Sequence, residues 1–288
     1  MRAPFVAILC FILALPLVGT ACADPVSDRI YPAPRQPLSL EGSPEGTGLV
    51  SVTTRDGLTL NGLEAAARDG MPTLLVLHGN GSTATDTIRR FRSAIAVGYG
   101  VVAADYRGYS TNPGRPSEAG LAADADAFMA LARNRAGQGP LWIVGHSLGG
   151  GVGLSLAQRD APDAVITIGT FTRLRDMTSG LVRAIVPNAY RNQDAVGQLT
   201  VPYFLIHGTA DDVVPVDHGY ALHRLAGAAG RTGASFVIVG EGHDPDGETI
   251  TRILEVIRAG GAELTMSPEG LPEEVKLIPF GQTKSLNP

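Results

Sequence analysis

Short, continuously apolar runs recur along most of this 288-residue sequence, separated by stretches whose apolar residues have helical spacing. Runs that are apolar on both faces are typical of strands covered by helices on both sides. Strands alternating with helices predict an α/β fold with a doubly wound, mostly parallel sheet. The apolar runs are 73–77, 100–104, 141–144, 165–168, 203–206 and 235–239, and the helical stretches are 84–97, 118–132, 148–158, 216–226 and 249–258.

The domain built from these elements is predicted to extend from residue 48 to 260. It opens with a hairpin, because the segments on either side of Asp56-Gly57 alternate apolar and polar residues. Residues 170–200, after the sixth strand, carry only a weak helical pattern and predict a small cap insertion. Residues 24–47, rich in Pro, Ser and Gly, predict an extended leader or tether, and 261–288 predict a C-terminal tail along the surface.

The first 23 residues have the features of a secretory signal peptide: a basic start, an apolar stretch and small residues at the end. Cleavage after Ala23 predicts an exported protein, periplasmic or secreted. Alternatively, residues 17–22 resemble a bacterial lipoprotein box, in which a lipidated Cys22 would become the N-terminus and associate the protein with a membrane. The other cysteine of the chain, Cys10, lies inside the segment to be removed, so no disulfide is expected.

Composition excludes two broad classes of protein. Hydrophobic residues make up 44% of the chain and the net charge is only −5, a balance atypical of disordered chains. Binding to nucleic acid requires clustered Lys and Arg to neutralise phosphates, and the acidic charge balance of this chain is atypical of such proteins. We therefore expect a globular protein that does not bind nucleic acid.

The most informative motif is Gly-His-Ser-Leu-Gly at residues 145–149, directly after the predicted strand 141–144 and at the start of a helix. A strand–turn–helix with this pattern is typical of a nucleophile elbow, in which the turn strains the serine backbone and exposes its hydroxyl. Side chains at Gly145 and Gly149 would collide with neighbouring backbone. We therefore predict Ser147 as a nucleophile.

A serine hydroxyl needs a general base, and four histidines follow Ser147 in the chain. His243 lies in a Gly-rich loop after the last predicted strand, where a side chain can reach back over the sheet, and we predict it as the base. His207 ends a strand and is expected to be structural. His218 and His223 lie on a predicted helix at a spacing that favours neither a shared face nor a metal pair, so we expect both at the surface.

The base in turn needs a carboxylate to orient it. Asp211 follows the preceding strand in a loop of the same class and is the predicted acid, with adjacent Asp212 as the alternative. Asp244 and Asp246 are too close to the histidine in sequence to orient it, and a position at the helix N-terminus accounts for them.

Backbone amides must also stabilise the oxyanion that forms during attack on a carbonyl. The Leu148 amide, at the start of the elbow helix, is one predicted donor. The second is expected from the loop after strand 73–77, where Asn80 is the first candidate and Gly81 the next. His78, which opens that loop, is expected to make a structural hydrogen bond beneath it.

Taken together, these motifs resemble the α/β-hydrolase superfamily, and the resemblance extends from about residue 50 to 258. Within that superfamily, four segments are similar to the Bem46/ABHD-like serine hydrolases, which include membrane-associated lipases and protein depalmitoylases. These segments are His-Gly-Asn-Gly at 78–81, Asp-Tyr-Arg-Gly-Tyr-Ser at 105–110, Gly-Arg-Pro-Ser-Glu at 114–118 and the elbow at 145–149.

The resemblance implies a catalytic triad of Ser147, Asp211 and His243, with Asn80 and Leu148 forming the oxyanion hole. It implies no metal and no organic cofactor. Within the second segment, an Asp and an Arg, Asp105 and Arg107, would brace the loop beside the site. The chain departs from the family at residues 80–83, where Asn-Gly-Ser-Thr replaces the frequent Asn-Ala-Gly-Asn.

The sequence therefore predicts hydrolysis of a small-molecule carboxylic ester or thioester through an acyl-enzyme on Ser147. An acyltransferase or a peptidase could use the same triad, and a non-catalytic binding module is a further alternative. The short insertion predicts an open, shallow site. Its apolar residues would line an acyl pocket or pack onto the sheet; they are Phe171, Leu174, Met177, Leu181, Val182 and Ile185.

Overall fold

The computed structural model describes residues 30–178, 189–260, 264 and 270–282, which form a sheet in the order β1-β2-β4-β3-β5-β6-β7-β8-β9. Neighbours from β4 to β8 pair in parallel, whereas β1 with β2, β2 with β4 and β8 with β9 pair antiparallel. This mostly parallel sheet confirms the predicted fold class. The strands are β1 Gly48–Thr53, β2 Thr59–Ala65, β3 Thr73–Leu77, β4 Gly100–Ala103, β5 Leu141–His146, β6 Ala164–Ile168, β7 Tyr203–Gly208, β8 Gly233–Ile238 and β9 Val275–Pro279.

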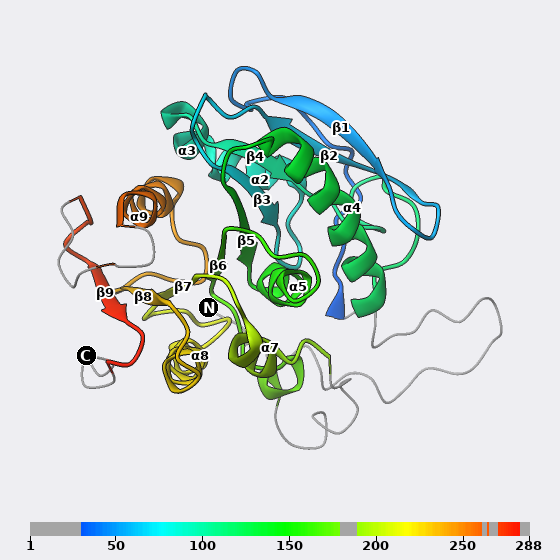
Figure 1. The fold of residues 1–288 in the computed structure, drawn as a ribbon. Coiled ribbons are helices and arrows are strands. Elements are labelled where there is room, and N and C mark those ends of the chain that lie inside the picture. Colours follow the sequence, from blue (N-terminus) through cyan, green and yellow to red (C-terminus); the bar gives the residue numbers. More distant parts are fainter. Residues whose placement is uncertain (1–29, 179–188, 261–263, 265–269, 283–288) are drawn as a thin grey trace, which may run out of the picture.

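Helices cover both faces of the sheet (Figure 1). Helices α2, α3 and α9 pack on one face, and α4, α5, α7 and α8 on the other. The helices are α2 Ala84–Arg90, α3 Arg92–Val97, α4 Glu118–Ala136, α5 Leu148–Ala157, the 3-10 helix η2 Leu174–Met177, α7 Asn192–Gln198, α8 Val216–Ala228 and α9 Gly247–Gly260.

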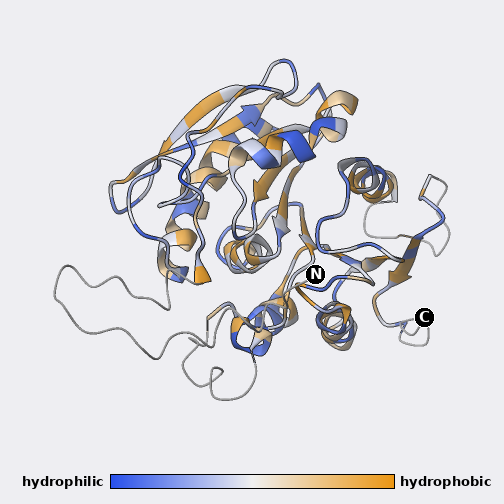
Figure 2. Ribbon diagram, turned by 180° about the vertical axis from the view of Figure 1, so that it is seen from behind, coloured by the Kyte–Doolittle hydropathy of each residue, from blue (hydrophilic) through white to orange (hydrophobic). Residues whose placement is uncertain are grey.

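Two apolar cores, one on each face of the sheet, follow from the alternation of side chains along the buried strands. In β3, Leu75 and Leu77 belong to the core beneath α4 and α5, and Leu74 and Val76 belong to the core beneath α2 and α9. Figure 2 shows the central strands largely hydrophobic and the helices mixed, as expected for amphipathic helices on a doubly covered sheet.

One predicted helix is divided in the structure. The stretch 84–97 forms two helices, α2 and α3, which meet at Phe91, where the backbone leaves helical geometry (φ −86°, ψ 14°). The Phe91 side chain is buried in the core beneath α9. Helix α2 begins at Thr83 with a capping box, in which Thr83 and Asp86 bond each other's backbone amides.

The described part of the cap insertion consists of η2 and α7. Its residues Leu181, Val182 and Ile185 lie outside the described residues, as do the predicted signal peptide and Cys22. The remaining insertion residues favour the packing alternative, because Phe171 is buried and Leu174 and Met177 pack against the same core.

The expectation that residues 261–288 lie along the surface as a tail is corrected by β9. This strand pairs antiparallel with β8 and extends the sheet beyond residue 260. Val275, Leu277 and Ile278 are buried, so the strand is part of the core structure. The run 275–279 was not predicted as a strand, because five residues in a proline-containing segment cannot be distinguished from a loop by their sequence pattern.

The predicted extended leader or tether over residues 24–47 is described from residue 30 onward, and this part is bound to the domain. Tyr31 is buried, and its hydroxyl lies 3.0 Å from that of Tyr190 at the end of the cap insertion. The Pro34 carbonyl accepts a hydrogen bond from Ser110 N (2.6 Å). Residues 30–34 therefore form a strap, which crosses the carboxyl edge of the sheet and packs against it.

Candidate active site

Ser147 lies at a sharp turn between β5 and α5. It is one of few described non-glycine residues with positive φ (φ 52°, ψ −115°), a conformation that costs about 1–3 kcal/mol. Close backbone packing requires the flanking glycines, because a Cβ on Gly149 would lie 2.0 Å from the Leu77 oxygen of β3. A Cβ on Gly145 would lie 2.4 Å from the Gly149 oxygen. The strained serine is therefore imposed by the packing of α5 against β3 and β5.

The amide groups at this turn have separate roles. Ser147 N donates to the Ile168 oxygen at the end of β6 (2.8 Å), which leaves it unable to stabilise an oxyanion. Leu148 is the first residue of α5, so its amide has no acceptor within the helix. No other acceptor for the Leu148 amide occurs in the described chain, which leaves it free to bind a developing negative charge.

The predicted acid and base are in contact. His243 Nδ1 donates to Asp211 Oδ2 (2.8 Å), while Asp211 Oδ1 accepts from the amides of Val213 (3.0 Å) and Val214 (2.7 Å). Burial raises the pKa of Asp211, but hydrogen bonds from His207, His243 and the Val214 amide hold it well below its usual value. The carboxylate is thus ionised and fixes the His243 tautomer whose Nε2 can accept a proton.

The sheet places these residues side by side. Ser147 follows β5, Asp211 follows β7 and His243 follows β8, and the carboxyl ends of parallel neighbours meet at one edge. Gly169, after β6, passes beneath the pair: a Cβ there would lie 3.1 Å from His243 Nδ1 and 3.3 Å from Asp211 Oδ2. The Ser147 hydroxyl has no hydrogen-bond partner among the described residues.

The β3–α2 loop forms the other side of the site. A Cβ on Gly79 would lie 3.1 Å from Ser147 Cβ, so the loop passes directly against Ser147. The Asn80 side chain holds the loop from two directions: Nδ2 donates to the Ile30 oxygen (2.5 Å), and Oδ1 accepts from the Tyr109 hydroxyl (3.1 Å). The Asn80 amide has no acceptor in the described chain and is available as the second oxyanion donor.

Known proteins are similar to this chain in sequence and in fold. A family model described as "alpha/beta hydrolase fold" matches residues 72–181. An uncharacterised protein of Mycobacterium tuberculosis is 35% identical over 218 residues, which cover 70% of this chain and 74% of the relative. The chain belongs to the α/β-hydrolase fold family. This membership confirms the family resemblance and the prediction that the chain is a hydrolase.

More distant relatives of this α/β hydrolase include lysophosphatidylserine lipase ABHD12 of Danio rerio, 31% identical over 57% of this chain and 49% of the relative. The chain thus spans about half the length of that lipase. Among solved structures, an α/β hydrolase of Vibrio vulnificus has a TM-score of 0.62 at 20% identity and covers 77% of this chain and 82% of its own. An esterase of a Rhodococcus species has a TM-score of 0.56 at 18% identity, with 73% and 97% covered.

The loop beneath the oxyanion side is braced by Asp105 and by two ion pairs of Arg107, of which the pair with Asp124 is buried. Asp105 Oδ1 accepts from the Ala84 amide at the start of α2 (2.9 Å). Arg107 bonds Asp124 of α4 through Nε (2.8 Å) and Asp56 of the β1–β2 turn through both terminal nitrogens (2.7 and 3.0 Å). Both residues have the bracing contacts that the family resemblance implies.

His78 lies under the same loop, as expected. Its Nδ1 is 2.9 Å from the Gly79 oxygen, and its ring packs against Tyr106 and Tyr109. Burial lowers the pKa of His78, although Asp105 Oδ1 lies 3.6 Å from Nε2. The imidazole therefore fills the space beneath the loop as a neutral, structural group.

Two expectations about histidines at the surface are corrected. His223 is completely buried, with Nδ1 2.8 Å from Ser235 Oγ of β8, and burial lowers its pKa. His218 is half-buried, and its Nδ1 lies 2.9 Å from Thr172 Oγ1 of the cap insertion. His223 faces β8 and His218 faces the cap insertion, and the apolar spacing of a short helix did not predict either contact.

The three other aspartates near His243 differ in their contacts from Asp211 and from one another. Asp212 is exposed, whereas Asp211 faces the histidine, which favours Asp211 as the acid. Asp246 Oδ1 accepts from the amides at the start of α9, as expected. Asp244 does not cap this helix: it pairs with Arg90 of α2 (2.5 Å), and that expectation is wrong.

One residue that the sequence did not single out, His146, contacts His243 and precedes Ser147 in the chain. His146, adjacent to Ser147, bonds through Nε2 to the His243 backbone oxygen (2.9 Å), and the two rings lie 4.8 Å apart. Burial, and then the proximity of His243, lower the pKa of His146 to about 4. Its position inside the elbow motif was the available signal, but the motif alone does not predict the direction of the ring.

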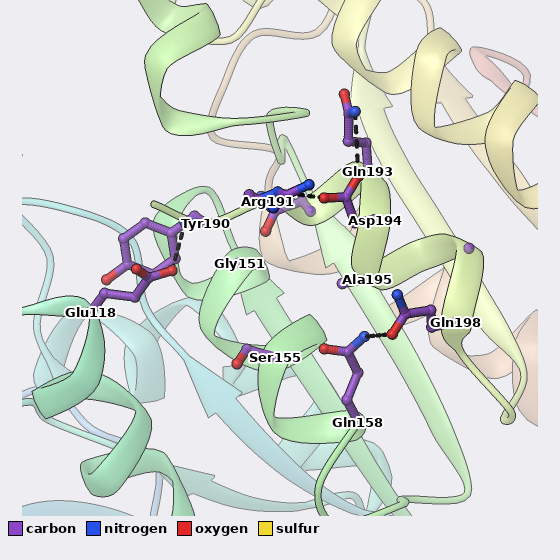
Figure 3. Close-up of a pocket in the computed structure, with 12 residues that line it drawn as sticks. Glu118, Gly151, Ser155, Gln158, Tyr190, Arg191, Gln193, Asp194, Ala195 and Gln198 are labelled. Carbon is purple, nitrogen blue, oxygen red and sulfur yellow. Dashed lines mark hydrogen bonds and ion pairs between the residues drawn. The ribbon is translucent and has the colours of Figure 1, made fainter. Parts of the chain in front are cut away.

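A cavity of about 750 Å³ lies beside α5 (Figure 3) and does not include the predicted triad. Polar side chains from α5 and α7 line it, and many are already paired. Gln158 bonds Gln198 (3.1 Å), and Glu118 accepts from the Tyr190 amide (2.6 Å). Among the described residues, no group of His, Cys, Asp or Glu is placed to hold a metal ion, and no helix is long and apolar enough to cross a membrane.

Proposed function

We propose that this chain is a serine hydrolase that cleaves carboxylic ester bonds through an acyl-enzyme on Ser147. One observation carries the proposal: the strained Ser147 turn lies on the same sheet edge as the bonded Asp211–His243 pair. Nucleophilic catalysis by serine requires a histidine to accept the hydroxyl proton and a buried carboxylate to orient that histidine. This arrangement provides both.

In the proposed reaction, the Ser147 hydroxyl attacks the acyl carbonyl while His243 Nε2 accepts its proton. The imidazolium is stabilised by Asp211 and then protonates the departing alcohol, which leaves an acyl-serine ester. Water, activated by the same histidine, hydrolyses this ester and regenerates the serine.

The negative charge of the tetrahedral intermediate falls between the elbow and the β3–α2 loop. The amides of Leu148 and Asn80, both without protein acceptors in the described chain, are the proposed donors. Each such donor contributes about 2.7–4 kcal/mol of transition-state stabilisation.

The substrate proposed is an acyl ester of a small molecule or a lipid. The relatives named lysophosphatidylserine lipases, 31% and 28% identical over 57% and 60% of this chain, support the lipid form. A thioester is an alternative with the same chemistry. An acyltransferase would differ only in the acceptor of the acyl group, and a peptidase only in the leaving group.

Labelling by a fluorophosphonate probe tests the nucleophile. The wild-type protein should label, and Ser147→Ala should not, while Ser155→Ala on the outer face of α5 should label as the wild type does. Equal labelling of Ser147→Ala, or no labelling of the wild type, would show that the proposal is wrong.

A panel of p-nitrophenyl esters of increasing chain length then tests the acyl group. Lysophosphatidylserine and lysophosphatidylcholine, compared at equal chain length, test whether an acidic head group is preferred. Product analysis with an added alcohol distinguishes hydrolysis from acyl transfer, because only a transferase gives mainly the new ester.

Export is proposed from the sequence of residues 1–23, which lie outside the described residues. Intact mass of the protein recovered from its producing cell tests the two routes. Cleavage after Ala23 gives an unmodified chain beginning at Asp24, whereas the lipoprotein route gives a diacylated Cys22. An unprocessed chain beginning at Met1 would contradict both.

A further inference from the structure

Asp211 lies within reach of two histidines, and only one of them is placed to act as the base. His243 Nδ1 is 2.8 Å from Asp211 Oδ2, and His207 Nε2 is 3.3 Å from the same oxygen. His207 belongs to β7 and is 1% exposed, so it cannot reach a substrate. Its contact with the carboxylate is therefore a feature of the site that the proposed reaction does not use directly.

The partners of His207 fix the position of its proton. Nε2 lies 2.8 Å from the Val214 carbonyl oxygen, and a carbonyl oxygen can only accept a hydrogen bond. Nε2 must therefore carry hydrogen; it donates to Val214, and Asp211 Oδ2 lies 3.3 Å from the same N–H group. Nδ1 is buried without a partner in the described chain and packs against Gly219, where a Cβ would lie 2.6 Å away.

This arrangement costs free energy, because a buried polar atom without a partner loses its hydration. An apolar side chain at the end of β7 would fill the same space without that cost. The donor at Nε2 offsets the cost, since it bonds the one loop that carries the acid. The histidine thus connects β7 to both the backbone and the side chain of this loop.

The second donor changes what the carboxylate can do for the base. Two amides donate to Asp211 Oδ1 and His243 donates to Oδ2, while the His207 N–H group lies 3.3 Å from Oδ2. Each hydrogen bond to a carboxylate stabilises its charged form and lowers its affinity for a further proton. His207 therefore weakens the attraction of Asp211 for the Nδ1 proton of His243 and so limits the basicity of His243.

We propose that His207 is a positioning residue that holds Asp211 against β7 and sets the pH at which His243 becomes active as a base. The inference rests on the proposed function, because the pH at which the base acts is measured only in an active enzyme. It assigns to His207 a role beyond closing the end of the strand.

Other ionisable groups face this pair from neighbouring elements. Burial lowers the pKa values of two of them, His146 to about 4 and His218 below its usual value. The charged groups nearest to these histidines are Arg90 of α2 and Asp244 before α9, beside His146, and Asp176 of η2 and Asp217 of α8, beside His218.

Two polar substitutions separate the proposed role from a structural one. In His207→Gln, the amide nitrogen can take the position of Nε2 and keep the donor. In His207→Asn, the amide is too short to reach Asp211, so the donor is lost. The measurement is kcat/KM for p-nitrophenyl acetate between pH 5 and 9, together with labelling by a fluorophosphonate.

We expect His207→Asn to move the acid limb of the profile upward by about 0.5–1 pH unit. The limb moves upward because loss of a donor near Asp211 strengthens the Asp211–His243 hydrogen bond. The stronger bond stabilises the imidazolium, so His243 stays protonated to higher pH. Activity at pH 6 should then fall about threefold to tenfold relative to activity at pH 8. His207→Gln should leave the limb within about 0.2 unit of wild type.

His223→Asn is the matched control, because His223 is equally buried, loses its Nε2 contact with the Gln282 oxygen (3.3 Å) and does not contact Asp211 in the described structure. Its acid limb should not move. If His207→Asn does not fold, His207→Leu replaces it with the same expected shift, since an apolar side chain of similar size tolerates burial.

An unmoved limb in the variants without a donor, or an equal shift in His223→Asn, would overturn the inference. The failure of the proposed function has a different signature, because wild-type protein would then neither label nor turn over the ester. Labelled, active variants with unchanged profiles would contradict only the role of His207.

Discussion

The two sides of the candidate site are held in place by different kinds of contact. On the acid–base side, Asp211 is buried and bonded by residues of its own loop, of β7 and of the loop after β8. On the oxyanion side, Asn80 is exposed, and its side chain is held by the Ile30 carbonyl, 50 residues earlier in the chain. One side is fixed by adjacent strand ends, and the other also depends on the strap at residues 30–34.

This difference separates two requirements of catalysis. The acid and base must keep one geometry throughout the reaction, and burial of their bonds provides it. The oxyanion donors must be preorganised too, but the loop that carries them must also admit a substrate carbonyl. The strap holds the oxyanion loop from outside the sheet. Its contact with Asn80 can therefore be removed by mutation without disturbing the strands.

Loss of the acid should have the largest effect. Asp211→Asn keeps the shape of the side chain. It either places an amide NH₂ where Oδ2 accepts the hydrogen bond from His243 Nδ1, or favours the wrong His243 tautomer. We expect kcat to fall by about 10⁴-fold, with KM little changed. Asp212→Asn, at the adjacent exposed position, should be within about twofold of wild type. Similar losses in both variants, measured by ester hydrolysis, would contradict the assignment of Asp211.

The ion pairs beneath the oxyanion side should matter more to stability than to the chemical step. Arg107→Met leaves Asp124 buried without its partner, and we expect a loss of about 3–5 kcal/mol in the free energy of unfolding. Arg135→Met breaks an exposed pair with Glu64 and should cost less than about 1 kcal/mol. Urea denaturation measures both. The double variant Arg107→Met/Asp124→Leu should recover much of the loss, because no unpaired charge stays buried.

The acid–base side and the oxyanion side also differ in how well they could be predicted from the sequence. The alternation of apolar runs and helical stretches was sufficient for the sheet and for the positions of β3 to β8, because burial on both faces leaves a strong pattern. The elbow and the loops after β7 and β8 could be predicted for the same reason: each polar residue directly follows a buried strand. The acid–base side was therefore largely accessible from local sequence.

The oxyanion side was less accessible because its contacts join distant segments. Nothing in a Pro-rich stretch predicts that the Ile30 carbonyl would accept from Asn80 or that Tyr31 would bond Tyr190. The inward direction of His223 and the pairing of Asp244 with Arg90 also depend on packing between elements. These interactions are specified by tertiary structure, on which the local pattern carries no information.

Removing the link to the strap tests the oxyanion side directly. Asn80→Ala removes both side-chain bonds but keeps the backbone amide. If the strap positions that amide, kcat should fall about tenfold to 100-fold while KM changes little, since the lost interaction acts mainly in the transition state. Ser82→Ala, in the same loop and without a side-chain hydrogen bond in the described structure, should retain activity. An Asn80→Ala enzyme with wild-type kcat would show that the loop is positioned without the strap.

His146 lies between the two sides and should have the smallest effect, chiefly on the pH dependence of stability. Its Nε2 bonds the His243 carbonyl, and its Nδ1 would lie 3.0 Å from a Cβ on Gly79 of the oxyanion loop. Burial lowers its pKa to about 4 in the folded protein, whereas an unfolded histidine has a pKa of about 6.5.

The unfolded chain therefore binds a proton at His146 between about pH 4 and 6.5 that the folded protein excludes, and stability must fall as the pH falls through this window. At pH 5 this penalty is about 1–2 kcal/mol relative to pH 7. His146→Gln keeps a donor toward the His243 carbonyl but does not titrate, so the difference between its unfolding free energies at pH 5 and pH 7 should be smaller than that of wild type by this amount. Equal pH dependence in the two proteins would mean that His146 is not held neutral by the packing between the two sides. A loss of activity in His146→Gln at every pH would instead show that the imidazole itself is needed to align the base with Ser147.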